Sequence, residues 1–130
     1  MRSVYDAIKV LASLVPATRT ASADGAAVDT KGYNSAMAVI LAGDIDLANT
    51  DETYAFKVQE CATSGGTYTD VTGATAAVTA DNNVKVIRVE GLGTSRMRYL
   101  RIVATLGGTT PSWPGSVVFC LGNAYSEPVN

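Results

Sequence analysis

The spacing of apolar residues along this 130-residue chain changes near residue 16. Before that point, apolar side chains recur at intervals of three and four residues, which predicts a short amphipathic helix. Ser3 is suited to cap its N-terminus, and Pro16 is expected to end it, because proline lacks the amide hydrogen that a helix interior requires. We therefore expect an N-terminal helix or contact segment over residues 1–16. Its apolar positions are Val4, Ile8 and Leu11.

After residue 16, apolar and polar residues alternate, which predicts β-strands. The clearest alternation spans residues 53–61, where Tyr54, Phe56 and Val58 share one face. Residues 36–42 are apolar at consecutive positions, which predicts a strand buried on both faces. Further strands are expected at residues 67–71, 75–79, 84–90, 96–105 and 117–121, with an irregular strand pair or extended arm over residues 17–29.

Turn residues separate these strands. Ser64-Gly65-Gly66 predicts a hairpin between residues 53–61 and 67–71, and Asp81-Asn82-Asn83 predicts another between 75–79 and 84–90. About eight short strands with turn signals between them favour an all-β fold, a β-sandwich or jelly roll. We expect this single β-sandwich domain to span residues 17–130.

The composition favours protein partners. Charged residues make up only 17% of the chain, and a surface poor in charge is less protected against association. A formal net charge of −2 argues against nucleic acid as a partner. The apolar run at 36–42 is far shorter than the about 20 residues that cross a bilayer, so no membrane is expected. Asp6 and Lys9 interrupt any apolar signal segment, so we expect synthesis in the cytoplasm.

The chain contains no histidine. Histidine is the usual general base, the usual activator of a nucleophile and the commonest metal ligand. Three carboxylates, Glu60, Asp70 and Glu90, could in principle form a catalytic pair, but they lie in no local catalytic motif. We therefore predict a protein that is not an enzyme and has no cofactor.

Two further groups suggest metal or redox chemistry only weakly. The acidic stretch of residues 44–51 departs from a calcium-binding loop, since Ala48 stands where a ligand is needed. We interpret it as a solvated loop that discourages edge-to-edge strand pairing, with no metal bound. Cys61 and Cys120 are interpreted as reduced, buried thiols.

Candidate contact residues lie in the second half of the chain as well as the first. Three arginines are concentrated on one predicted strand, where they suit bidentate pairing with carboxylates across an interface or, alternatively, with the sheet's own acidic residues. Trp113, in a predicted loop, either anchors a partner or caps the sandwich. The expected protein-contact residues are Val4, Ile8, Leu11, Arg96, Arg98, Arg101 and Trp113.

Residues 28–36, residues 54–60 together with 66–71, and residues 98–103 resemble small β-rich proteins encoded near the major capsid gene of tailed phages. The resemblance implies a capsid decoration, or cement, protein on the outer surface of the virion. Such a protein would bind the major capsid protein at local symmetry axes and link its subunits as a dimer or trimer. Many decoration proteins attach through an extended N-terminal arm, whereas a helix is expected here.

Two other functions are compatible with a β-sandwich. A module that binds carbohydrate or a host surface would need aromatic side chains aligned on one face or end. A head-closure or tail subunit would form a ring-shaped oligomer. The aromatic candidates for the first alternative are Tyr33, Tyr54, Tyr68, Tyr99, Trp113 and Tyr125.

Overall fold

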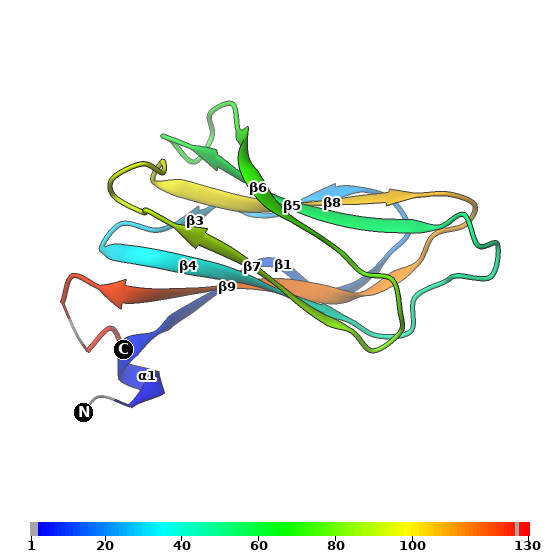
Figure 1. Cartoon of the computed structure of the whole chain (residues 1–130), viewed down its shortest axis with the longest axis horizontal. Coiled ribbons are helices and arrows are strands. Elements are labelled where there is room, and N and C mark those ends of the chain that lie inside the picture. Colours follow the sequence, from blue (N-terminus) through cyan, green and yellow to red (C-terminus); the bar gives the residue numbers. More distant parts are fainter. Residues whose placement is uncertain (1–2, 127) are drawn as a thin grey trace.

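The computed structural model describes residues 3–126 and 128–130. It shows an all-β sandwich in which two antiparallel sheets pack face to face (Figure 1). This confirms the predicted fold class. In chain order the elements are α1 (Val4–Ala7), β1 (Lys9–Arg19), β2 (Ala23–Asp24), β3 (Val28–Asp29), β4 (Tyr33–Ala42), β5 (Thr53–Cys61), β6 (Thr69–Ala77), β7 (Val84–Glu90), β8 (Tyr99–Gly107) and β9 (Trp113–Ala124).

The four-stranded sheet has the order β1-β9-β4-β7, and the five-stranded sheet has the order β2-β8-β5-β6, with β3 also paired to β8. The predicted hairpin of β5 and β6 is confirmed. The second predicted hairpin is wrong, because β6 pairs with β5 whereas β7 pairs with β4 in the other sheet. Between them the chain crosses from one layer to the other, and Asn82 adopts the left-handed conformation (φ 52°) that asparagine tolerates.

The core forms where the inward sides of the two sheets meet. The predicted alternation of β5 is confirmed, since Tyr54, Phe56 and Val58 are buried. Phe56 meets Trp113 edge to face, with ring centroids 4.9 Å apart, a favoured aromatic geometry. Six further core residues come from β8 and β9 and are completely buried: Leu100, Ile102, Ala104, Val117, Phe119 and Leu121.

The N-terminal segment differs from its prediction. Ser3 caps α1 as expected, accepting a hydrogen bond from the Asp6 amide, but the helix ends at Ala7. Residues 9–19 instead form β1, which pairs with β9 and crosses the expected boundary at residue 16. A helix of this length is marginal alone, whereas β1 gains a ladder of hydrogen bonds. Pro16 fits because it lies at a register irregularity on an edge strand.

Ser13 ties the two sheets together at one edge of the sandwich. Its buried hydroxyl donates to the carbonyl of Ala26 (2.8 Å) and accepts from the amide of Ile102 (3.2 Å). Its carbonyl accepts from the amide of Ala26 at 2.7 Å. A Cβ at Gly25 would overlap the Ser13 hydroxyl, so this close approach requires glycine. We call this arrangement the Ser13 clasp.

Candidate functional site

The outward side of the four-stranded sheet carries a continuous set of apolar side chains, here called the apolar face. Val10, Val84 and Val86 are each more than half exposed, at 56%, 59% and 51%. Clustered exposed apolar side chains are typical of surfaces that bind another protein. The members of the apolar face are Val10, Ala12, Met37, Val39, Leu41, Val84, Val86, Val118 and Cys120.

Strand register places these side chains in rows across the sheet. Val39 is paired with Val118 of β9 on one side and with Val86 of β7 on the other. Val118 is in turn paired with Ala12 of β1, so this row spans all four strands. Partners in an antiparallel pair have Cβ atoms about 5 Å apart, which makes the row one continuous surface.

A shallow hollow of about 480 Å³ lies at one end of the apolar face, next to α1. Ile8, Met37 and Cys120 are among its lining residues. Arg88 and Glu90 stand at its margin as an exposed ion pair, 3.3 Å apart. The hollow therefore extends the apolar face toward the N-terminal segment. The ion pair of Arg88 and Glu90 marks the limit of this apolar surface.

The structure separates the three N-terminal residues that were expected to contact a partner. Ile8 lines the hollow beside the apolar face. Val4 is 73% exposed in α1, whereas Leu11 is half-buried and packs against the core. Only Ile8 is thus brought to the apolar face.

The prediction that residues 36–42 are buried on both faces is wrong. Ala36, Ala38, Ile40 and Ala42 face the core, whereas Met37 and Leu41 are 36% and 42% exposed. The apolar residues at these outward positions were the sequence signal for the apolar face, but the prediction interpreted them as a second buried side. Val84 and Val86 carried the same signal in β7.

The outward side of the five-stranded sheet is polar by contrast. Arg101 donates two hydrogen bonds to Gln59 Oε1, and Gln59 donates to Asp70. Lys57 forms an ion pair with Asp70 at 3.1 Å. These hydrogen bonds, from Gln59 and then Lys57, lower the pKa of the Asp70 carboxyl. The charges on this face are therefore paired within the sheet, unlike the unpartnered apolar groups on the other.

The arginines follow the alternative prediction of pairing within the molecule. Arg101 lies 3.7 Å from Asp24, Arg98 lies 2.7 Å from Asp29, and Arg96 lies 3.3 Å from Glu60. Only Arg101 belongs to β8, because Arg96 and Arg98 precede that strand. Arg96 and Arg98 line a separate hollow of about 340 Å³.

Trp113 is completely buried at the start of β9, not in an exposed loop. Its indole nitrogen donates to the carbonyl of Leu41, and the Arg19 guanidinium lies 5.4 Å from the ring. The prediction that Trp113 contacts a partner is wrong, because its apolar ring completes the core. Tyr54 is buried as well, so neither aromatic is available for a carbohydrate-binding surface.

The remaining candidate groups are placed as follows. Cys61 and Cys120 are both free, Cys61 buried and Cys120 half-buried, and burial raises the pKa of the Cys120 thiol. Within residues 3–126 and 128–130, no group of three or more carboxylates and thiols could hold a metal ion. No helix among these residues is long and apolar enough to cross a membrane.

Two comparisons with known proteins gave no match. No protein-family model matches the chain, and no curated protein matches it in sequence. The arguments for function therefore come from the surfaces described above.

Proposed function

We propose that this protein is a virion structural protein that decorates a tailed-phage capsid and stabilises it by linking major capsid protein subunits. The apolar face carries this proposal. It offers a pleated apolar surface spanning four strands, with one ion pair at its margin. Covering such a surface removes apolar area from water, which contributes roughly 25 cal/mol per Å².

Many identical copies strengthen the effect. A decoration protein that binds only the assembled shell stabilises it by mass action, increasingly as its concentration exceeds its Kd. Each copy that touches two capsid subunits adds its own contact energy to the junction between them. We place the protein on the outer capsid surface, with its apolar face toward the shell.

Binding to undecorated capsids of the phage that encodes the chain tests this proposal. Purified protein is mixed with these capsids, and the bound copies are counted after sedimentation. Wild-type protein is expected to bind stoichiometrically and to raise the melting temperature of the shell. If it does neither, the proposed function is wrong.

A matched pair of variants tests the docking surface. Val86→Lys puts an ammonium group in the middle of the apolar face, and burying that charge should weaken capsid binding by about a hundredfold or more. Thr105→Lys makes a similar change at an exposed position on the outward side of the five-stranded sheet and should bind like wild type. Equal binding by Val86→Lys and wild type would show that another surface docks.

A further inference from the structure

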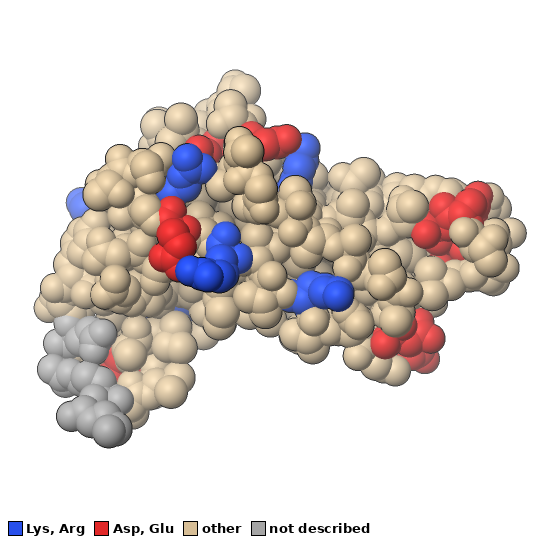
Figure 2. Space-filling view, in the orientation of Figure 1, with Lys and Arg blue, Asp and Glu red and all other residues tan. Residues whose placement is uncertain are grey.

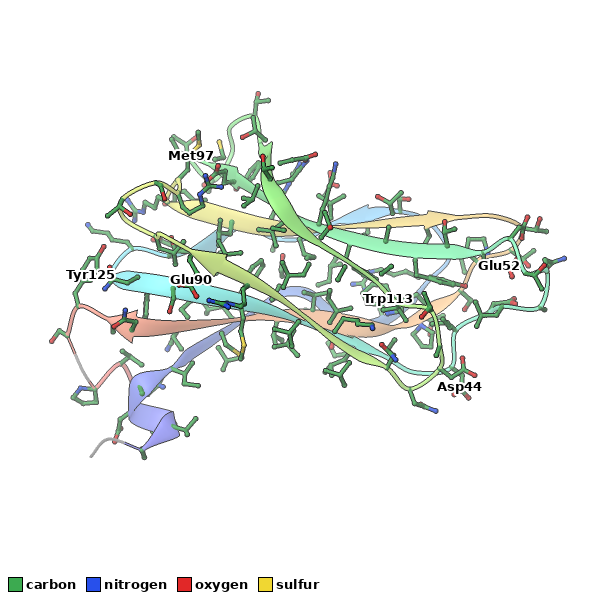
Figure 3. The ribbon with its side chains drawn as sticks, in the orientation of Figure 1. Asp44, Glu52, Glu90, Met97, Trp113 and Tyr125 are labelled. Atoms are coloured by element: carbon green, nitrogen blue, oxygen red, sulfur yellow. The ribbon has the colours of Figure 1, made fainter. Side chains whose placement is uncertain are left out.

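The hollow lined by Arg96 and Arg98 is a concave, basic surface at one end of the sandwich. It has a volume of about 340 Å³. Tyr125 stands at this end of the molecule in Figure 3. We call this site the basic hollow, and the residues that line it include Thr30, Lys31, Gly93, Arg96, Arg98 and Tyr125.

Acidic neighbours position the two arginines of the basic hollow. Asp29 accepts from Nε and Nη2 of Arg98 at 2.9 and 2.7 Å, and Glu60 holds Arg96. Because a guanidinium has five N–H donors, each arginine keeps donors for a further acceptor. Lys31 forms no ion pair among the described residues, so the hollow keeps one unbalanced positive charge.

The opposite end of the molecule is acidic. Figure 3 shows Asp44 and Glu52 there, and Figure 2 shows acidic groups at the narrow end of the molecule, with a basic group only toward the middle of the molecule. The ion pairs of the described residues include none of these carboxylates. We call this end the acidic tip, and its carboxyl groups belong to Asp44, Asp46, Asp51, Glu52 and Asp81.

Hydrogen bonds orient carboxyl groups of the acidic tip. Asp51 accepts from the amide and hydroxyl of Thr109 at 3.0 and 2.8 Å, and these bonds lower the pKa of its carboxyl. The side chain of Glu52 is buried, and its Oε2 atom has no hydrogen-bond partner among the described residues. Burial and the neighbouring Asp51 raise the pKa of Glu52. The Asp51 carboxylate is therefore oriented by Thr109 next to the buried Glu52 carboxyl.

These two ends complement each other in charge. The chain has a formal net charge of −2, so five carboxyl groups at the tip leave a formal excess of +3 on all other residues. A narrow acidic tip can approach a basic hollow only on another molecule, because the two lie at opposite ends of one sandwich (Figures 2 and 3). Guanidinium donors in fixed positions suit carboxylate acceptors.

We infer that the basic hollow binds the acidic tip of a second copy of this chain, so that the molecules associate end to end. Such a contact joins two different surfaces, and repetition closes into a ring when the rotation allows it. The apolar face takes no part in the contact and stays free on every copy. The inference concerns self-association and does not require that the proposed function be correct.

Two charge-reversal variants in dilute buffer test this inference. Asp44→Lys alters an exposed residue of the acidic tip, and Lys31→Glu alters an exposed residue of the basic hollow. Each variant alone should self-associate at least about tenfold more weakly than wild type, as measured by light scattering over a concentration series. Lys57→Glu reverses a charge on the polar sheet face and should associate like wild type.

Mixing the two variants distinguishes end-to-end binding from other modes. The Asp44→Lys chain keeps an intact basic hollow, and the Lys31→Glu chain keeps an intact acidic tip. Their mixture should form a complex of the two different chains, because the intact hollow of one can bind the intact tip of the other, whereas association through other surfaces would not depend on mixing. Wild-type association should also weaken as NaCl rises from about 0.05 M to about 0.5 M, because salt screens exposed charges.

Three results would overturn the inference. They are a wild-type protein that stays monomeric at low salt, variants that associate as wild type does, and a mixture in which no two-chain complex forms. If Lys31→Glu lowers the melting temperature, Lys31→Met replaces it in the same assays. None of these measurements involves capsids, so their failure would leave the proposed capsid binding to its own test.

Discussion

A single buried hydroxyl at Ser13 satisfies backbone groups from two other segments of the chain. If it is removed, the Ile102 amide and the Ala26 carbonyl each lose the hydrogen bond that the hydroxyl makes with them. We expect Ser13→Ala to lower the free energy of unfolding by about 2 kcal/mol, because buried polar groups that lose a partner cannot turn to water. Chemical denaturation followed by circular dichroism measures this change.

Ser22 provides a matched control for that substitution. Its hydroxyl accepts a hydrogen bond at 2.9 Å from the amide of Leu106, which lies in β8 as Ile102 does. Ser22 itself, however, is exposed. Water can replace the hydroxyl there, so Ser22→Ala should lower the free energy of unfolding by clearly less than Ser13→Ala does. If both substitutions lower the free energy of unfolding equally, burial of the Ser13 clasp does not add to its stabilising effect.

Asp29 gives the fold a pH-dependent contribution. Hydrogen bonds from Arg98 lower its pKa from 3.8 to about 2. A carboxylate with a lowered pKa stabilises the folded state above its unfolded pKa and loses that contribution as the pH falls toward the folded value. The stability difference between wild type and Asp29→Asn should therefore be fully present at neutral pH and shrink between about pH 4 and about pH 2.

The effect should be small, because both partners of this ion pair are nearly half exposed. Arg98→Met removes the same pair from the other side and serves as the second arm of the measurement. Denaturant titrations at several pH values should give both variants the same loss of pH dependence. A difference that stays constant down to pH 2 would contradict the assignment.

At the scale of elements, the N-terminal segment divides into a short helix and an integral strand. Removing residues 1–7 takes away α1 and leaves the whole of β1. We expect this deletion to fold with a melting temperature close to that of wild type. Removing residues 1–16 also strips most of β1 from β9 and takes out the buried Leu14, so this chain should not fold.

Circular dichroism melting distinguishes the two deletions, and capsid sedimentation then shows whether α1 contributes to docking. Because Ile8 remains at the margin of the apolar face, the shorter deletion should keep most of its capsid binding. A folded protein after removal of residues 1–16 would contradict the role assigned to β1.

Much of the strand content could be predicted because alternation is a local property. The strands at residues 53–61 and 84–90 were predicted correctly from the local sequence alone. Sheet membership could not be predicted in the same way, since β6 and β7 are neighbours in sequence but pair with different strands. The spacing of Val4, Ile8 and Leu11 fits a helix, yet pairing with β9 decides the conformation from Lys9 onward.

The site was predictable only in part. The apolar residues of 36–42 were recognised, but whether a second layer covers their outward side depends on the whole fold. The arginine pairs were anticipated as one alternative, because acidic residues were available in the neighbouring strands. Trp113 was misplaced, since the prolines around it suggested a loop where β9 already begins.

At the scale of the whole molecule, the four surfaces face different directions. The apolar face lies on one sheet, the paired charges lie on the other, and the acidic tip and basic hollow occupy the two ends. In a ring built from end-to-end contacts, every copy can present its apolar face to the same side. This arrangement links the proposed capsid docking to the inferred self-association without competition for one surface.

The Ser13 clasp also governs how the sandwich opens. It fastens the layers along one margin, while at the opposite margin the outermost strands, β6 and β7, belong to separate layers. These two strands pack against each other across the layers, with no hydrogen bond between them among the described residues. Because β6 and β7 are outermost strands and the Ile102 amide is bonded to the buried Ser13 hydroxyl, deuterium uptake should begin in β6 and β7 and reach the amide of Ile102 last.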